Sequence, residues 1–362
     1  MRIAVVGGGL LGSLLAWRLA TMPAARAASV GIELWTGGND DRAKDATTHS
    51  GGLVRAYADS GADSRLAARS LAELRSSPTL REWAGYQEVG SVVVLDGRSD
   101  PAEALAVVDD LMPGHVRLAD PAELERRFSL GNLPEGSFGI VEEQAGYVFP
   151  DRLRDALLAH LPTGRVQLQH RSVDSVDPRP AVRPAGGGAA RCYDAVILAT
   201  GPWTAAVLAR GGLAGAVYQT KQIQYTWCTG WPDGLGGFVD ETSGLYGRPA
   251  AGGGMIGVPT DRWGVDPSDV SVCDRATRQL RDAVKQRLPG AGGRALTLGL
   301  RTVPALDCFC QRPGPGAALR PVVDGSALYT FSGGSGGAVK TVLAASRDAA
   351  RAVLETLLQP DA

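Results

Sequence analysis

The feature that most constrains this chain is a glycine turn close to its first residue, with the pattern Gly7-x-Gly9-x-x-Gly12. A β-branched run at residues 3–6 precedes the turn, apolar residues at helical spacing follow it, and a second apolar run comes at residues 31–35. This order is typical of a βαβ unit. In such a unit the glycines allow a tight turn, close approach of the backbone to a pyrophosphate, and close packing of helix on strand. The pattern therefore predicts a dinucleotide-binding domain at the start of the chain, with the anion at the helix N-terminus.

The residue expected to bind ribose departs from the usual pattern. An acidic side chain normally follows the second strand of such a unit and binds a ribose hydroxyl. Thr36 stands at this place, and Glu33 lies inside the strand, where we do not expect it to reach the ribose. A threonine accepts fewer hydrogen bonds than a carboxylate, so we expect the ribose to be held more weakly or with help from the backbone.

Composition narrows the class of protein. At 362 residues the chain is long enough for about two domains. Its 37 basic and 38 acidic residues leave a net charge of −1, which argues against nucleic acid or an anionic membrane as a partner. No apolar stretch is long enough to span a membrane. Five cysteines without a C-x-x-C pair and four scattered histidines predict neither a disulfide framework nor a metal site, and they favour a cytoplasmic protein.

Two further glycine turns also follow predicted strands. Residues 194–201 form an apolar run that leads into a Gly-Pro-Trp turn at 201–203, and residues 327–331 lead into a glycine-rich turn at 333–337 and a final helix. The N-terminus of that helix carries a partial positive charge, which would stabilise a bulky ligand that becomes anionic on reduction. Between these turns, three strands of an antiparallel sheet are predicted at residues 217–228, 235–248 and 252–258.

Five segments carry a family resemblance. They read Thr-Thr-His-Ser-Gly-Gly-Leu-Val-Arg at 47–55, Gly-Tyr-Val-Phe-Pro at 146–150, Tyr-Asp-Ala-Val-Ile-Leu-Ala-Thr-Gly-Pro-Trp at 193–203, Leu-Tyr-Gly-Arg-Pro at 245–249 and Phe-Ser-Gly-Gly-Ser-Gly-Gly-Ala-Val-Lys at 331–340. Together with the first glycine turn, and in this order, they resemble the flavin-dependent amine and amino-acid oxidase family that includes D-amino acid oxidase, glycine oxidase and monomeric sarcosine oxidase. The likeness covers nearly the whole chain.

The resemblance implies an α/β fold in two domains. A Rossmann-like FAD-binding domain is assembled from residues 1–75, 145–215 and 300–362. A substrate domain of α+β type, with an antiparallel sheet over the flavin, comprises residues 76–144 and 216–299. The implied cofactor is FAD, and the implied partner is a small amine or amino acid that carries a carboxylate. The oligomeric state stays open.

The resemblance and the glycine turns together assign the cofactor contacts. The residues predicted to bind FAD are Gly7, Gly9, Leu10, Leu11, Gly12, Thr36, His49, Ser50, Gly51, Gly52, Gly201, Trp203, Cys308, Gly333, Gly334, Ser335, Gly336, Gly337 and Lys340. The resemblance leaves three alternatives: a covalent bond to the flavin 8-methyl group through a cysteine (Cys308 ahead of Cys310), a bond through His49, and no covalent bond. The run that follows the cysteine in the family is missing here, because residues 311–314 read Gln-Arg-Pro-Gly.

The substrate contacts are implied in the same way. Arg55 and Lys340 resemble the pair that binds the substrate carboxylate in the sarcosine oxidase branch, and Tyr246 resembles the family's active-site tyrosine. A carboxylate held by two cations fixes the carbon that is oxidised, so positioning supplies much of the rate. Met255 stands where sarcosine oxidase relatives carry an oxygen-activating lysine, and Lys221 on the neighbouring strand is a candidate to replace that cation.

We therefore expect an FAD-dependent enzyme that oxidises the C–N bond of an amino acid or of a secondary or cyclic amino acid. The resemblance implies hydride transfer from the carbon next to nitrogen to flavin N5, which gives an imine, with O2 as the acceptor and H2O2 as its product. Three alternatives stay open: an amine dehydrogenase with another acceptor, an NAD-dependent dehydrogenase with the same glycine fingerprint, and a flavin-carrying subunit of low intrinsic activity.

Overall fold

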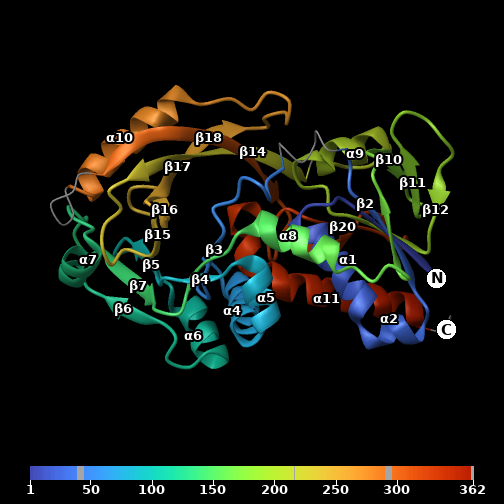
Figure 1. The fold of residues 1–362 in the computed structure, drawn as a ribbon, viewed down its shortest axis with the longest axis horizontal. Helices are drawn as coiled ribbons and strands as arrows, with labels where there is room; N and C mark the ends of the chain where they lie inside the picture. The colour runs from blue at the N-terminus through green and yellow to red at the C-terminus, as the bar shows by residue number, and fades with distance from the viewer. Residues whose placement is uncertain (39–44, 216, 290–295, 360–362) are drawn as a thin grey trace. The chain divides into compact units, whose positions relative to one another are not determined.

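The computed structural model describes residues 1–38, 45–215, 217–289 and 296–359. Packing divides the chain into two compact units, and Figure 1 labels their helices and strands. The first unit comprises Met1–Ser50, Pro150–Thr220 and Leu306–Ala362, and the second comprises Gly51–Phe149 and Lys221–Ala305. Among the described residues, no helix has both the length and the apolar character needed to cross a bilayer.

The first unit is built on a six-stranded sheet. The strand order is β19 (Ala318–Pro321), β20 (Leu328–Ser332), β13 (Ala195–Leu198), β1 (Arg2–Val6), β2 (Gly31–Trp35) and β9 (Val166–Gln169). β19 is antiparallel to its neighbour, and the other five strands are parallel. Val5, Leu34 and Ile197 are completely buried, as expected for parallel strands that are covered on both faces.

Helices and a small sheet pack on these strands. α1 (Leu10–Thr21) begins directly after the first glycine turn and packs on α8 (Pro150–Ala159) and α11 (Ala338–Leu358), as Figure 1 shows. Leu14, Leu15 and Leu19 of α1 are completely buried, and each contributes about 1.5–3 kcal/mol by leaving water. The other elements are α2 (Pro23–Ala27), η1 (Gly201–Trp203), α9 (Thr204–Arg210), η3 (Ser335–Gly337) and a sheet of β10 (Val173–Asp177), β11 (Ala181–Pro184) and β12 (Arg191–Cys192).

The second unit contains most of an eight-stranded mixed sheet. Its order is β18 (Thr297–Cys310), β14 (Tyr218–Thr229), β17 (Gly253–Trp263), β16 (Leu245–Ala250), β15 (Gly237–Asp240), β5 (Ser91–Leu95), β7 (Phe138–Glu142) and β6 (Arg117–Ala119). β14, β17, β16 and β15 are antiparallel to one another in turn, which confirms the antiparallel sheet predicted for this part of the sequence. β15 and β5 are parallel, a pairing that the sequence pattern did not predict.

One predicted strand is a hairpin. The pattern at residues 235–248 predicts a single strand, and this is wrong, because the chain reverses at 241–244 between β15 and β16. The carboxylate of Asp240 accepts hydrogen bonds from Thr242 N at 3.0 Å and from the hydroxyl of Ser243 at 2.5 Å. Gly244 completes the turn with a φ of 76°. These local bonds stabilise the reversal, which the apolar pattern alone does not indicate.

One long helix packs on the mixed sheet of the second unit. α10 (Asp274–Arg287) packs on β16 and β17 through an apolar face that includes Leu280 and Val284. The remaining elements are α4 (Gly61–Ser76), α5 (Pro78–Ala84), α6 (Ala102–Leu111), α7 (Pro121–Phe128) and a three-stranded sheet of β3 (Leu53–Val54), β8 (Gly146–Tyr147) and β4 (Gln87–Glu88). Residues 51–75, which the sequence analysis grouped with the FAD domain, lie in the second unit, where α4 packs on α6.

A buried ion pair in this unit leads to a stability prediction. Arg287 Nε and Asp240 Oδ2 lie 2.5 Å apart, and the two side chains are 1% and 0% exposed. Replacing Arg287 by alanine leaves a buried carboxylate without its cation, so we expect the free energy of unfolding to fall by about 3–5 kcal/mol. The matched control is Arg275→Ala, which breaks an exposed pair with Asp261 and should lower it by less than about 1 kcal/mol. Urea denaturation followed by tryptophan fluorescence measures both changes, and equal effects would contradict the prediction.

Candidate functional site

Three glycine turns meet at one edge of the first unit's sheet. β1, β13 and β20 are neighbouring parallel strands, so their carboxyl ends lie at the same edge. A turn with glycine follows each strand, at residues 7–12, 199–203 and 333–337. Residues of all three turns line one cavity of about 350 Å³. Turns from both ends and the middle of the chain are thus brought together, at the place where parallel α/β sheets bind ligands.

The first turn requires glycine at two positions for packing and leaves a third position open. Gly7 has a φ of 121°, and a Cβ there would lie 2.2 Å from the carbonyl oxygen of Ala199. A Cβ at Gly12 would lie 1.9 Å from the carbonyl oxygen of Gly7. Among the described residues, a Cβ at Gly9 would meet only the hydroxyl of Thr47, at 3.2 Å. The backbone therefore excludes a side chain at positions 7 and 12, whereas Gly9 leaves the backbone accessible from the cavity.

The N-terminus of α1 contributes to the same cavity. Gly9 is its N-cap residue, and the N–H of Leu10 donates to the hydroxyl of Thr47 at 3.0 Å. The first turn of α1 contains no acidic residue. Backbone N–H groups in the first turn of a helix have no acceptor within the helix, and the helix dipole adds partial positive charge there. This end of the cavity is therefore suited to a phosphate.

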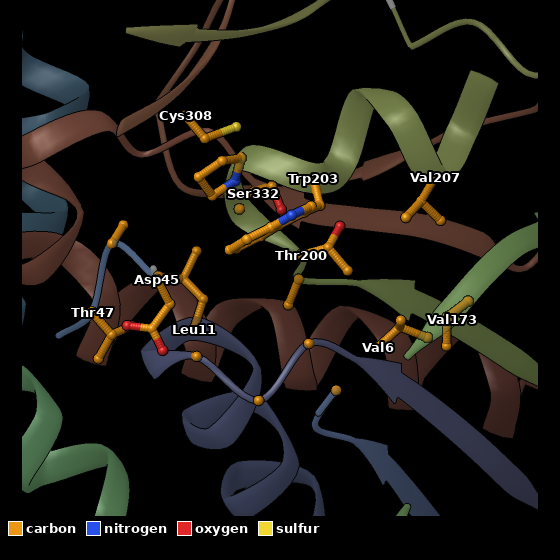
Figure 2. A pocket seen from close by; sticks show the side chains of 18 of the residues that line it. Val6, Leu11, Asp45, Thr47, Val173, Thr200, Trp203, Val207, Cys308 and Ser332 are labelled. Carbon is orange, nitrogen blue, oxygen red and sulfur yellow. The ribbon is translucent and has the colours of Figure 1, made fainter. Parts of the chain in front are cut away.

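Side chains from the other two turns enclose the cavity. Figure 2 shows the indole of Trp203 lying across it, between Cys308 and Leu11. Ser332, the last residue of β20, accepts a hydrogen bond from the hydroxyl of Thr204 at 3.0 Å. This bond links the segment that follows β13 to the end of β20. It therefore holds the turns at 199–203 and 333–337 in place relative to each other.

Thr36 occupies the end of β2, where an acidic residue is usual. It lines the cavity, and its hydroxyl lies 3.1 Å from Nδ1 of His170. Glu33 is buried within the sheet and accepts a hydrogen bond from the phenol of Tyr193 at 2.6 Å. Burial acts to raise the pKa of Glu33, but the hydrogen bonds from Tyr193 and Arg2 outweigh it and lower the pKa. Glu33 is thus bound inside the sheet and is not part of the cavity lining, in agreement with the expectation from sequence.

The third turn leads into α11. The carboxylate of Asp307 lies against Gly336, where a Cβ would come 2.9 Å from Oδ2. Lys340 is in the first turn of α11, and its side chain runs back over Gly337, where a Cβ would lie 3.3 Å from Cε. A cation at a helix N-terminus opposes the helix dipole by about 0.3–1 kcal/mol. An anionic ligand near Lys340 would offset this repulsion.

Comparison with known proteins identifies the family. The sequence matches the FAD dependent oxidoreductase family over residues 2–352. The chain belongs to this family. Its cofactor is therefore FAD, as the resemblance implied, and the NAD-dependent dehydrogenase is excluded. A comparison with curated protein sequences found no match.

Solved structures share the fold of this FAD-dependent oxidoreductase. L-proline dehydrogenase from P. horikoshii is 16% identical, with a TM-score of 0.78 over 98% of this chain and 93% of that chain. Glycine oxidase from Bacillus cereus ATCC 14579 is 16% identical, with a TM-score of 0.72 over 98% and 95% of the two chains. Iminodiacetate oxidase from Chelativorans sp. BNC1 is 20% identical, with a TM-score of 0.70 over 98% and 95%. These likenesses confirm the two-part fold that the sequence predicted.

The cavity fits the phosphate part of FAD. The open backbone at Gly9 and the N-terminus of α1 form a cradle that a Cβ would fill. The backbone of the first turn would hold the pyrophosphate, and Thr36 would face the ribose. Predicted cofactor residues that line the cavity are Gly7, Gly9, Leu10, Leu11, Thr36, Gly201, Trp203, Cys308, Gly333, Gly334 and Ser335.

The other predicted cofactor residues are not part of this lining. They are Gly12, His49, Ser50, Gly51, Gly52, Gly336, Gly337 and Lys340. Gly12 acts through packing, Gly51 and Gly52 belong to the second unit, and the contacts of the others with FAD stay predictions.

Some residues that line the cavity were not predicted from the sequence. They include Asp45, Thr47, Arg171, Asp174, Arg210 and Asp307. Of these, only Thr47 lies in one of the segments that carry the resemblance. No local sequence pattern indicates that the others contact the cofactor.

Arg55 of the second unit is buried, and no carboxylate of the described residues forms an ion pair with it. It follows β3, its residue is 8% exposed, and its Nε has no hydrogen-bond partner in the described chain. The N–H groups of Ala56 and Tyr57 both donate to the carboxylate of Glu142, at 2.7 and 2.9 Å. Glu142 in turn lies 2.9 Å from Nε2 of His115. The backbone next to Arg55 is therefore fixed by a buried network that leaves the guanidinium itself uncompensated.

The structure places Tyr246 and Met255 together and Lys221 elsewhere in the second unit. Tyr246 and Met255 belong to one apolar cluster, and Met255 pairs with Trp227 across β14 and β17. Lys221 pairs with Trp263, and its ammonium lies 4.8 Å from the centre of that ring. Along β14, Lys221 is six residues from Trp227, or about 20 Å at about 3.4 Å per residue. Lys221 is therefore not beside Met255, and a catalytic role for it stays a prediction.

The thiol of Cys308 gives a prediction that does not depend on turnover. Cys308 lines the cavity, and burial, followed by the charges of Cys310 and Asp307, raises the pKa of its thiol to about 12. Only the thiolate reacts with alkylating agents, so at pH 8 we expect iodoacetamide to modify Cys308 about 10³-fold more slowly than a thiol of ordinary pKa. Exposed Cys192 is the internal control. Peptide mass spectrometry over a time course measures the alkylation rates of Cys308 and Cys192. Comparable rates would contradict a buried Cys308 thiol with a raised pKa.

Proposed function

We propose that this FAD-dependent oxidoreductase oxidises the C–N bond of an amino acid, or of a secondary or cyclic amino acid, to an imine. The observation that carries the proposal is Arg55, a buried guanidinium with an unpartnered Nε in the described chain. A buried cation without a counterion is unfavourable, and a substrate carboxylate supplies the counterion. The names of the three solved relatives support this substrate class, because proline, glycine and iminodiacetate each combine an amine with a carboxylate.

The proposed roles of the side chains follow from their chemistry. Arg55 offers a planar fork that binds a carboxylate through two hydrogen bonds, and Lys340 adds a point charge. Arg55 belongs to the second unit and Lys340 to the first, and their joint binding of one carboxylate is part of the proposal. When bound, FAD supplies the two-electron acceptor for the C–N bond. Clamping the carboxylate fixes the carbon next to nitrogen and so reduces the entropy lost on reaching the transition state.

The electron acceptor divides the proposal into two candidates. As an oxidase, the enzyme passes the two electrons and two protons from the substrate to O2, which leaves as H2O2. A dehydrogenase with another acceptor is favoured by Met255, which is apolar and 1% exposed at the place expected for an oxygen-activating lysine. An oxygen electrode compared with an artificial dye acceptor separates the two: oxidase activity consumes O2 in proportion to imine, and a dehydrogenase turns over only with the dye.

The proposed substrate class is tested with the holoenzyme under anaerobic conditions. We expect α-amino acids or N-alkyl amino acids to bleach the flavin absorbance, and amines without a carboxylate to do so far more slowly. Failure of every amine in the panel would overturn the proposal. Flavin fluorescence after a denaturing gel reports covalent attachment, and Cys308→Ser and His49→Ala then show which side chain carries any bond.

A further inference from the structure

Three arginines of the second unit are buried in the described structure, and only one of them has a carboxylate partner. Arg55, Arg248 and Arg287 are 8%, 5% and 1% exposed. Arg287 pairs with the buried carboxylate of Asp240. No carboxylate of the described residues contacts Arg55 or Arg248. The unit thus holds two buried positive charges that its own residues leave uncompensated.

The guanidinium of Arg248 is held in place by neutral groups. Its Nε donates to the carbonyl of Gly51 at 2.6 Å, and its Nη1 donates to the carbonyl of Pro249 at 3.1 Å. Its Cζ lies 4.1 Å from the centre of the Tyr147 ring and 5.7 Å from that of Phe149. These contacts fix the orientation of the fork but leave its charge uncompensated. Consistent with this, burial lowers the pKa of Arg248 below its ordinary value.

Arg248 lies on the same face of the sheet as the predicted active-site tyrosine. Tyr246 and Arg248 are two residues apart on β16, so their side chains leave the strand on the same face. Leu245, on the other face, packs into the core under α10. Arg248 also pairs across the sheet with Met255, which belongs with Tyr246 to the apolar cluster described above. The arginine is therefore placed among the residues expected to contact substrate.

Gly51 connects the two unpaired arginines through a short segment. Its carbonyl binds Arg248, and Arg55 lies four residues further along the chain. Four residues span at most about 14 Å, so both arginines are anchored close to the segment that contains β3.

We propose that Arg248 binds a second acidic group of the substrate, separate from the carboxylate held by Arg55. The substrate class is then an amino acid or secondary amine with two carboxylates. A guanidinium fork matches a carboxylate in shape and charge, and each of the two buried arginines would gain its own counterion. The inference rests on the proposed function, since it names the substrate class of that same site.

Matched substrates test this inference. Asparagine and glutamine replace one carboxylate of aspartate and glutamate by a neutral amide of nearly the same shape, and sarcosine lacks one carboxylate of iminodiacetate. Each α-amino acid is tested as both enantiomers. We expect the wild-type holoenzyme to prefer the diacid of a pair by about 10- to 100-fold in kcat/KM. Arg248→Met should remove this preference, mainly by raising KM for the diacid, so that kcat/KM falls about 10- to 100-fold more for the diacid than for its neutral partner. Arg248→Lys should restore part of the preference, and exposed Arg275→Met should keep all of it.

The outcomes separate this inference from the proposed function. If some amine bleaches the flavin but the wild type shows no preference for diacids, the inference alone is overturned. An equal loss with both members of a pair in Arg248→Met also overturns it, because this is the result of a purely structural role. If no amine reacts, the proposed function fails. The inference is then decided by the affinities for succinate and butyrate, measured by titration and flavin difference spectra. Tighter binding of succinate to wild type than to Arg248→Met supports it, and equal binding overturns it.

Discussion

Replacing Arg55 by methionine is expected to lower kcat/KM for amino-acid substrates about 10²- to 10⁴-fold, through both KM and kcat. Two charge-assisted hydrogen bonds to a carboxylate are lost, and each is worth about 1.5–3 kcal/mol. The neighbouring backbone should stay in place, since Glu142 still binds the N–H groups of Ala56 and Tyr57. Steady-state kinetics with the best substrate of the anaerobic panel measures the change.

Stability and cofactor content distinguish a role of Arg55 in substrate binding from a purely structural role. Because methionine removes an uncompensated buried cation, we expect the melting temperature to stay the same or rise, and the FAD content to stay unchanged. Arg55→Lys should recover part of the activity, since it keeps the charge but not the fork. Arg65→Met on α4 is the control, because Arg65 is exposed. A loss of activity in Arg55→Met that is equally large for an amine without a carboxylate would contradict the assignment.

Replacing Gly9 by alanine is expected to weaken FAD binding about 100-fold while leaving the protein folded. Gly9 has a φ of −72°, which any residue adopts, and the Thr47 hydroxyl is the only described group that a Cβ there would meet. The added methyl group instead projects toward the place where the pyrophosphate approaches the backbone. Titration of the apoprotein with FAD, followed by flavin fluorescence, gives the affinity, and circular dichroism reports the fold.

Two neighbouring glycines and one distant glycine provide the comparison. Gly12→Ala and Gly7→Ala should lower the stability of the apoprotein as well, because each Cβ would lie within about 2 Å of a carbonyl oxygen. Gly164→Ala should change neither property, since no atom of the described part of the chain lies within 4 Å of its Cβ position. The double variant Gly9→Ala with Thr47→Ala removes the contact of the new methyl group with the Thr47 hydroxyl. Recovery of FAD affinity in this double variant would show that Thr47, not the cofactor, is displaced, and would contradict the prediction.

Much of the fold was readable from local patterns in the sequence. The first glycine turn, its flanking strand and helix, and the apolar strand that becomes β13 all depend on neighbouring residues. Hydrophobic periodicity and the position of Gly7 between a predicted strand and a predicted helix are properties of a few consecutive residues, so they are visible without the fold. The same holds for the turn before α11 and for β14 and β17 of the second unit, but not for the hairpin of β15 and β16. The family resemblance extended these local patterns to FAD.

Tertiary structure decided which of these pieces meet and which charges remain unpaired. The order β20-β13-β1 brings together turns that are more than 300 residues apart, and the mixed sheet includes a parallel β15–β5 pair that no local pattern indicated. Lys221 and Met255 lie on neighbouring strands but far apart along them, because the register of β14 and β17 separates them. Whether a buried arginine has a counterion depends on side chains contributed by distant segments: Arg287 meets Asp240, while Arg55 and Arg248 meet no carboxylate in the described chain. Local sequence encodes backbone conformation and which face of an element is apolar. Strand pairing and charge compensation are set by long-range packing, and for that reason only the fold revealed them.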